Sequence, residues 1–503
     1  MDTLGISRFV WALIVAILLL QVIIGVCILL FFTMIAGLQL QDYTPHWIIR
    51  IWHRGCKIMV VVFIILFSFS LYIMIELIFK KHEFSALPFY LPVELNQLLP
   101  ESIKFLKITF TKKGLVFYFL TLVLYPISVY LLFMDKDRWI DWYLYFGGYV
   151  VIVWILFIVM FTDNFLIACS GHILICCISF FVIYFVLWRY SKVRVPVIIW
   201  VFFFGGVLLI ISGACGLYFL TGSFTWSITQ GVSLEGVVGV LVQYCFYFGV
   251  LLPVGLFPAC YLTLGNCKAL PTSFRIFFNT VFLLQCFFMI TLIFNLLGCI
   301  VFKYLFVSII YVTIIILIIY LYFETTFSGI ISLGATLHFY LFLLISIFDP
   351  SILHNGLVFH IWVQLLYVSG NIIILAKYSR CYEKCVTIFK NGVFYKYPGT
   401  VCINMAVILF VSVCLGSFFY EVYWNFTCVS GDIIAFTILN FLVANFVIVW
   451  GLILWRWLNF WFTVPKVPDT HTPKRFTWVE AIGLVYLLLI AIGSVFFPWI
   501  FYW

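Results

Sequence analysis

Long apolar runs, nearly free of charged residues, follow one another along almost the whole chain. A helix needs roughly 20 apolar residues to cross a membrane. About fourteen runs reach that length: 8–36, 57–79, 114–134, 141–161, 164–188, 195–220, 236–257, 273–298, 303–323, 327–347, 352–378, 400–420, 428–457 and 478–501. The sequence therefore predicts an all-α polytopic membrane protein with about 14 transmembrane helices.

Charged residues make up only 9% of the 503 residues, which is too few for the water-facing surface of a soluble domain. Basic residues in the loops predict the orientation. With fourteen spans, 19 of the 27 Lys and Arg residues fall on the face opposite the termini. Both termini are then expected on the outer side. The net charge of +9 is explained in this way and requires no nucleic-acid partner.

Motifs for cofactors are missing from the sequence. It contains no GxGxxG, Walker or nucleophile-elbow pattern, and its 16 cysteines mostly lie inside apolar runs, away from metal-ligand spacing. We expect neither a cofactor nor a metal in this chain. Apolarity carried by 59 Phe residues is typical of biased codons, as in some organelle genomes.

Two apolar runs are interrupted by helix-breaking residues. FGVLLPVGLFP contains Pro253 and Pro258, and CLGS contains Gly416. A proline removes one backbone donor and frees the carbonyl four residues earlier, here Gly249. Paired interruptions in the two halves of a chain are typical of inverted-repeat transporters, so we expect broken helices in spans 7 and 12. Such breaks survive at membrane depth only where protein or water satisfies the backbone.

Polar side chains inside the spans are the candidate site, because such groups are costly in a membrane. The ionisable ones are His172, His338, His360 and Glu421. Uncharged amides accompany them: Gln243, Asn279, Gln285, Gln364 and Asn371. Each can instead be a packing residue that hydrogen-bonds across a helix interface. We expect Glu324, at the end of a span, to be within reach of water or head groups.

Several segments, in their order along the chain, resemble one known family. They are TFTKKGLVFYFLTLVLYPISVYLL, TDNFLIACSGHILICC, FGVLLP with a downstream LPT, GATLHFYL, GSFFYE and RFTWVEAIGLVYLLLIAIGSVFFPWIF. The family is that of the antiporter-like membrane subunits of proton-pumping NADH–ubiquinone oxidoreductase, respiratory complex I. FGVLLP resembles its FG[VI]KLP segment, GATLHFYL its SHM segment and GSFFYE its GxxGEF segment. The likeness covers nearly the whole chain.

The resemblance implies site residues only where the residues match. The family's span-five Glu corresponds to His172, and the FG[VI]KLP lysine falls on Leu251. The lysine of the next span falls on Leu284 or Gln285. The histidine of span ten is kept as His338. The remaining positions of the implied proton path are Gln364, with His360 one turn earlier, and Glu421.

The resemblance also implies how the chain is divided, which partners and cofactors surround it and where it is located. Residues 1–134 would hold the first three spans, 135–298 and 299–457 the two antiporter-like halves, and 458–503 the last span. NAD, FMN, iron–sulfur clusters and ubiquinone are expected in other subunits, and the partners are other membrane subunits and lipids such as cardiolipin. The implied location is the mitochondrial inner membrane, with both termini on the intermembrane-space side.

Two functions stay open at this point, because a leucine replaces a proton-carrying lysine. In the first, the chain conducts protons through the site residues. In the second, it is a degenerate module that braces a membrane arm without pumping. The rival classes are a free-standing cation/proton antiporter, another antiporter-like chain of the same complex, and an unrelated carrier or channel.

Overall fold

A computed structural model describes residues 89–90, 109–110, 164–186, 197–222, 236–260, 282–297, 303–324 and 327–348, together with residues 224 and 451 and short pieces of 151–162. Its contacts divide the chain into two units. One is Met1–Phe185 with Phe224–Trp226, and the other is Val186–Ser223 with Ser227–Trp503. The predicted breaks and polar residues that are described belong to the second unit, apart from His172.

The first unit contains helix α6, Phe165–Val186, and a small antiparallel pair of strands. The strands β1, Phe89–Tyr90, and β2, Thr109–Phe110, lie in the polar 80–113 stretch. Helix α6 begins with an amino-terminal cap, because the Asn164 side-chain oxygen accepts a hydrogen bond from the backbone N–H of Leu166 at 2.9 Å. Outside the two short strands and the residues Thr162, Asn164 and Phe224, the described part of this unit is helical.

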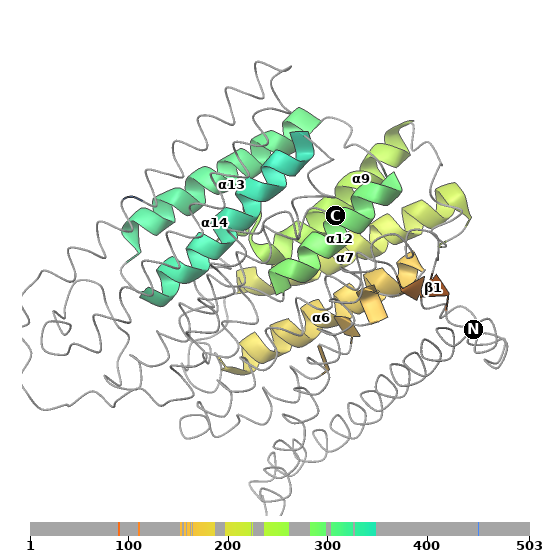
Figure 1. The fold of residues 1–503 in the computed structure, drawn as a ribbon, viewed down its shortest axis with the longest axis horizontal. Coiled ribbons are helices and arrows are strands. Elements are labelled where there is room, and N and C mark those ends of the chain that lie inside the picture. The colour runs from red at the N-terminus through yellow and green to blue at the C-terminus, as the bar shows by residue number, and fades with distance from the viewer. Residues whose placement is uncertain are drawn as a thin grey trace, which may run out of the picture. The chain divides into compact units, whose positions relative to one another are not determined.

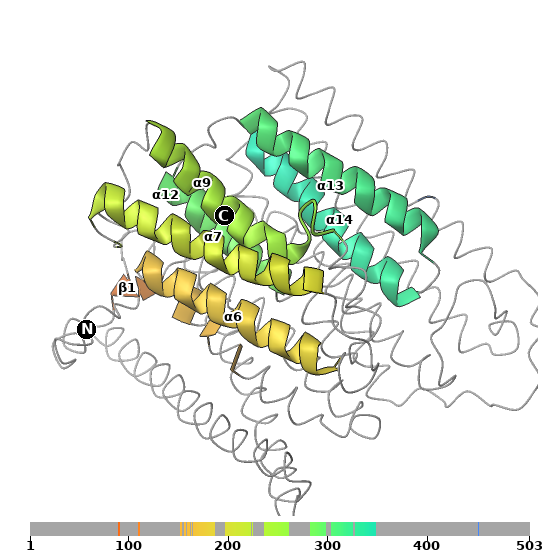
Figure 2. The same ribbon diagram turned by 180° about the vertical axis from the view of Figure 1, so that it is seen from behind.

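The second unit is built from helices on the predicted apolar runs. They are α7 (Val197–Thr221), α9 (Gly236–Leu251) with the 3₁₀ turn η4 (Leu252–Val254), α12 (Leu283–Leu297), α13 (Lys303–Phe323) and α14 (Phe327–Phe348). Helix α7 lies beside α9, and α13 beside α14 (Figures 1 and 2). Helix α9 also contacts α12.

The described helices fit a membrane by length and composition. Three are long and apolar enough to cross one: Trp200–Thr221, Gly236–Val254 and Tyr304–Phe323. Large apolar side chains such as Leu208 on α7 and Leu305 on α13 are exposed, as expected for helices that face lipid or apolar partners. The predicted helical membrane protein is confirmed for this part of the chain, whereas the number of spans and the four-part division stay predictions.

Glycines bring α7 and α9 into close contact. A side-chain carbon at Gly206 would lie 2.8 Å from the Gly249 carbonyl oxygen, and one at Gly249 would lie 2.6 Å from a side-chain carbon of Ile210. Farther along, Gly216 faces Val242 in the same way. Small residues are the usual means by which membrane helices approach each other closely, because lipid offers no hydrophobic drive to pack them.

Candidate functional site

Helix α9 ends inside its apolar run, at the sequence that contains Pro253. The α-helix stops at Leu251, and a 3₁₀ turn follows over Leu252–Val254. Pro253 has no N–H to give to the carbonyl of Gly249, so the regular ladder cannot continue. Gly255 then takes φ 96°, a left-handed conformation that glycine adopts without a steric penalty. These two residue types explain why the helix ends here.

Neighbouring helices contact the backbone at this end of α9. The Tyr340 hydroxyl on α14 donates to the Leu251 carbonyl at 3.4 Å, and the backbone N–H of Phe257 donates to the Thr313 hydroxyl on α13 at 3.0 Å. The Gly249 carbonyl lies against Gly206 of α7. Protein groups from three helices thus cover the polar backbone that the interruption exposes, as membrane depth requires.

The predicted interruption residues differ in their surroundings. Pro253 is buried and its ring packs near Gly206, whereas Pro258 is exposed. The peptide bond between Phe257 and Pro258 is cis. Gly416, the second predicted break, lies outside the described residues. The pairing of two broken helices therefore stays a prediction.

His172 lies on α6 in the first unit and is completely buried. Its Nε2 atom is 3.5 Å from the Sγ atom of Cys176, one turn later on the same helix. A side-chain carbon at Gly171 would collide with Val159 and lie 3.3 Å from Ile155, so protein side chains occupy that side.

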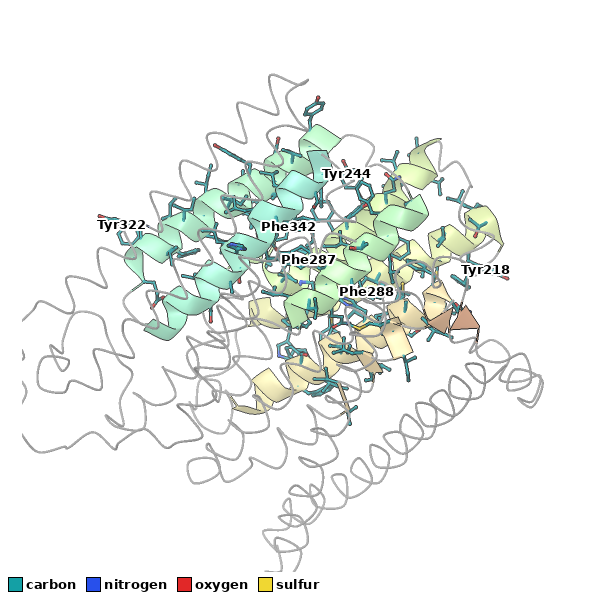
Figure 3. All side chains as sticks on the ribbon, viewed as in Figure 1. Tyr218, Tyr244, Phe287, Phe288, Tyr322 and Phe342 are labelled. Carbon is teal, nitrogen blue, oxygen red and sulfur yellow. The ribbon has the colours of Figure 1, made fainter. Side chains whose placement is uncertain are left out.

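Gln285 on α12 and His338 on α14 are both buried in the second unit. The two helices meet through aromatic rings: Phe287 lies 4.2 Å from Phe339 and 5.6 Å from Phe342 between centroids (Figure 3). Gln285 is two positions before Phe287, roughly 200° away around the α12 axis. Gln285 and His338 therefore sit on neighbouring helices, and Gln285 lies on a different face of α12 from the ring contact.

The remaining predicted path residues, His360, Gln364 and Glu421, lie outside the described residues. Gln243 is described: its side-chain amide donates to the Leu297 carbonyl at 3.0 Å, which ties α9 to α12. This contact matches the packing role that the sequence left open for the glutamine.

Two polar residues at this site were missed or misplaced by sequence reasoning. Tyr340 is buried with its hydroxyl at the end of α9, but one tyrosine among 29 in the chain carries no signal of its own. Glu324 is 6% exposed, against the expectation of easy access to water. Its side chain lies over Gly329, so that a carbon added there would be 2.8 Å from the carboxylate oxygen Oε1. The burial of Glu324 could have been suspected from the sequence, because a glutamate just before a helix is followed by a glycine in the first turn of that helix.

The buried groups include hydroxyls, two imidazoles and a carboxylate, which are able to hold and pass protons. Among the described residues, no group of three or more His, Cys, Asp or Glu side chains is arranged to hold a metal ion. The arrangement is compatible with proton handling and with helix packing.

No protein-family model matches the sequence, and no curated protein matches it. Among solved structures, the fold is similar to that of a chain of respiratory complex I from Thermus thermophilus, in a structure with bound aureothin. The TM-score is 0.65 at 11% sequence identity, and the match covers 96% of this chain and 97% of that chain. The resemblance seen in the sequence is confirmed at the level of the fold.

Proposed function

We propose that the chain is a membrane-arm subunit of a proton-pumping NADH:ubiquinone oxidoreductase, respiratory complex I. The observation that carries this proposal is the fold match to a complex I chain over nearly the full length of both chains. The ordered sequence segments point to the same family independently of that match. The redox chemistry belongs to other subunits, which hold NAD, FMN, the iron–sulfur clusters and ubiquinone.

The proposed identity within the complex is the chain 4 type of antiporter-like subunit. The GSFFYE segment favours chain 4 over chains 2 and 5. Its neighbours would then be chains 2 and 5, accessory subunits and lipids such as cardiolipin, in the mitochondrial inner membrane. The exposed apolar faces of α7 and α13 suit either protein or lipid contact.

Proton translocation is the proposed task of the chain within the complex. Burial of His172 and His338 supports it, because ionisable groups are costly to place in a membrane without a use. The proposed path residues are His172, Gln285, His338, His360, Gln364 and Glu421.

Purification tests the membership. The tagged chain, extracted from its native membrane in mild detergent, should migrate on a native gel with a large assembly that oxidises NADH. A chain that purifies without NADH-oxidising partners would instead be a free-standing antiporter or carrier.

Pumping is tested in membrane vesicles that contain the purified assembly. His172→Ala should lower the number of protons pumped per NADH oxidised, while His82→Gln, in the polar 80–113 stretch, should leave it unchanged. An unchanged ratio in the His172 variant, with normal assembly, would argue against a relay through this residue.

A non-pumping brace is the second candidate, and one observation favours it. Protein groups on α7, α13 and α14 cover the end of α9, as a purely structural interruption would require. If the chain only braces the membrane arm, substitutions of His172 and His338 should change the thermal stability of the assembly and leave its proton-to-electron ratio intact.

A further inference from the structure

One face of α14 carries a row of buried polar residues that the predicted path does not use. Ser332, Thr336 and Tyr340 follow each other at intervals of four residues, and each is at most 3% exposed. With Gly329 they lie within about 80° around the helix axis, and His338 is on roughly the opposite side. The row is therefore distinct from the position of the predicted histidine.

The row begins at a buried carboxylate. Glu324, just before α14, lies over Gly329 in the first turn of the helix, and Ser332 is the next polar residue of that face. The free N–H groups and the dipole at a helix amino terminus stabilise a negative charge, which allows a carboxylate to be kept there at low exposure. Gly329 supplies the space, because any side chain at this position would collide with Glu324.

The row ends at the broken end of α9. The Tyr340 hydroxyl donates to the Leu251 carbonyl at 3.4 Å. Leu251 is also the acceptor for the backbone N–H of Leu256 at 3.1 Å, within the turn that follows the helix. The row thus connects one end of α14 with the interruption of a neighbouring helix.

We propose that Glu324, Ser332, Thr336 and Tyr340 form a proton path along α14, with Glu324 as its proton-holding entrance. This rests on the proposed proton translocation and assigns residues to it beyond the predicted histidines. Successive hydroxyls four residues apart are separated by about 6 Å along the axis, a gap that one bridging water spans. Each hydroxyl oxygen accepts a proton from one side and releases its own proton to the other. One proton thus leaves the Glu324 carboxyl for the row, and one leaves the Tyr340 hydroxyl for a water molecule at the end of α9, with no other bond changed.

A purely structural explanation of the same residues must be separated from this one. The Thr336 hydroxyl donates to the Ser332 carbonyl at 3.0 Å, which satisfies it within its own helix, and a carboxylate before a helix can serve only as a cap. Glu324→Gln separates the two roles. The amide keeps an acceptor oxygen for the helix terminus, but it cannot take up and release a proton.

The test uses the assembly that contains the chain, in vesicles, with Glu324→Gln and Tyr340→Phe. Three quantities are measured: NADH oxidation, protons pumped per NADH, and the temperature at which the assembly dissociates. Tyr322→Phe is the matched control, because Tyr322 is exposed on α13. Glu324→Asp, which keeps an ionisable group, serves as the conservative variant.

The proposal expects both path variants to assemble and to pump fewer protons per NADH, with pumping unchanged in the control and partly restored by Glu324→Asp. Pumping equal to wild type in both path variants would overturn it, whether or not thermal stability falls. If the assembly does not form with Glu324→Gln, the number of protons pumped per NADH is compared in Tyr340→Phe and Thr336→Val, and wild-type pumping in both would overturn the proposal.

The membership of the complex is checked first and separately, by finding the wild-type chain in an NADH-oxidising assembly. If it is absent there, the proposed function fails. The path is then tested in vesicles that hold the purified chain, by proton flux driven with a potassium diffusion potential. Equal flux in wild type and variants would overturn the path as well.

Discussion

At the scale of single residues, glycines and backbone groups make the close contacts around the end of α9. The Gly249 carbonyl, which Pro253 leaves without its helical donor, lies against Gly206. The hydroxyl of Thr313 accepts from the Phe257 N–H and itself donates to the Ile309 carbonyl at 2.8 Å. Small changes at these positions therefore act directly on the end of α9.

Gly249→Ala should destabilise the chain by about 1 to 3 kcal/mol, because the new carbon would lie 2.6 Å from Ile210 and 3.0 Å from backbone atoms of α7. The dissociation temperature of the purified assembly measures this. Gly205→Ala is the matched control, since nothing lies within 4 Å of a carbon added there. Equal stability of the two variants would contradict the close helix contact.

Thr313→Val should cost about 1 kcal/mol, because the Phe257 N–H loses its acceptor while the volume of the side chain is kept. Ser308→Ala serves as the control: Ser308 is an exposed residue of the same helix, and its hydroxyl donates to the nearby Tyr304 carbonyl. Thermal dissociation of both variants is compared, and a loss that is as large for Ser308→Ala would speak against the contact.

At the scale of elements, the end of α9 is defined by a proline and a left-handed glycine. The helix stops at Leu251 and its chain turns at Gly255. Helices α7, α13 and α14 then supply groups that pack around this turn. The local sequence therefore determines where α9 ends, and contacts with the other helices stabilise that end.

Gly255→Ala should destabilise the turn by about 1 to 2 kcal/mol, because a residue with a side-chain carbon pays for the left-handed conformation. Gly255→Asn should cost less, since asparagine visits that region more easily. Thermal dissociation of the two variants gives the order, and a reversed order would show that the turn changes its backbone conformation.

At the scale of the whole molecule, the chain has the fold of a complex I chain at 11% identity. A fold can stay similar at such low identity because the membrane constrains the length of the apolar segments and the places where helices break. Individual apolar residues can meanwhile replace one another. The basic loops predict how such a fold is oriented.

Protease protection tests that orientation. A tag at either terminus should be digested once the outer membrane is removed from mitochondria, because both ends are predicted on the intermembrane-space side. A tag in the basic 189–194 loop should stay protected until the inner membrane is opened. The reverse pattern would invert the predicted topology.

The sequence predicts elements better than it predicts contacts. The run 303–323 coincides with α13, and 327–347 ends one residue before α14 does, because an apolar run must match the membrane thickness. The sequence does not predict which helix faces contact one another. Tyr340 reaches Leu251 across 89 residues, and no local pattern encodes that pairing.

The candidate site was predictable only in part, for the same physical reason. Pro253 marks the interruption through backbone chemistry that is written in the sequence. Glu324 was expected near water but is buried over Gly329, because its surroundings depend on how α14 begins and packs. Polar residues can thus be found from sequence, while their partners require the fold.

The two contacts that close the end of α9 have a consequence for biosynthesis. The acceptor of the Phe257 N–H is the Thr313 hydroxyl, 56 residues later in the chain. The Tyr340 hydroxyl that donates to the Leu251 carbonyl is 89 residues later. A ribosome that has just delivered α9 to the insertion machinery has not yet translated either partner. The nascent chain must therefore satisfy the Phe257 N–H in another way until α13 has been made, whereas the Leu251 carbonyl already accepts the N–H of Leu256 within its own turn.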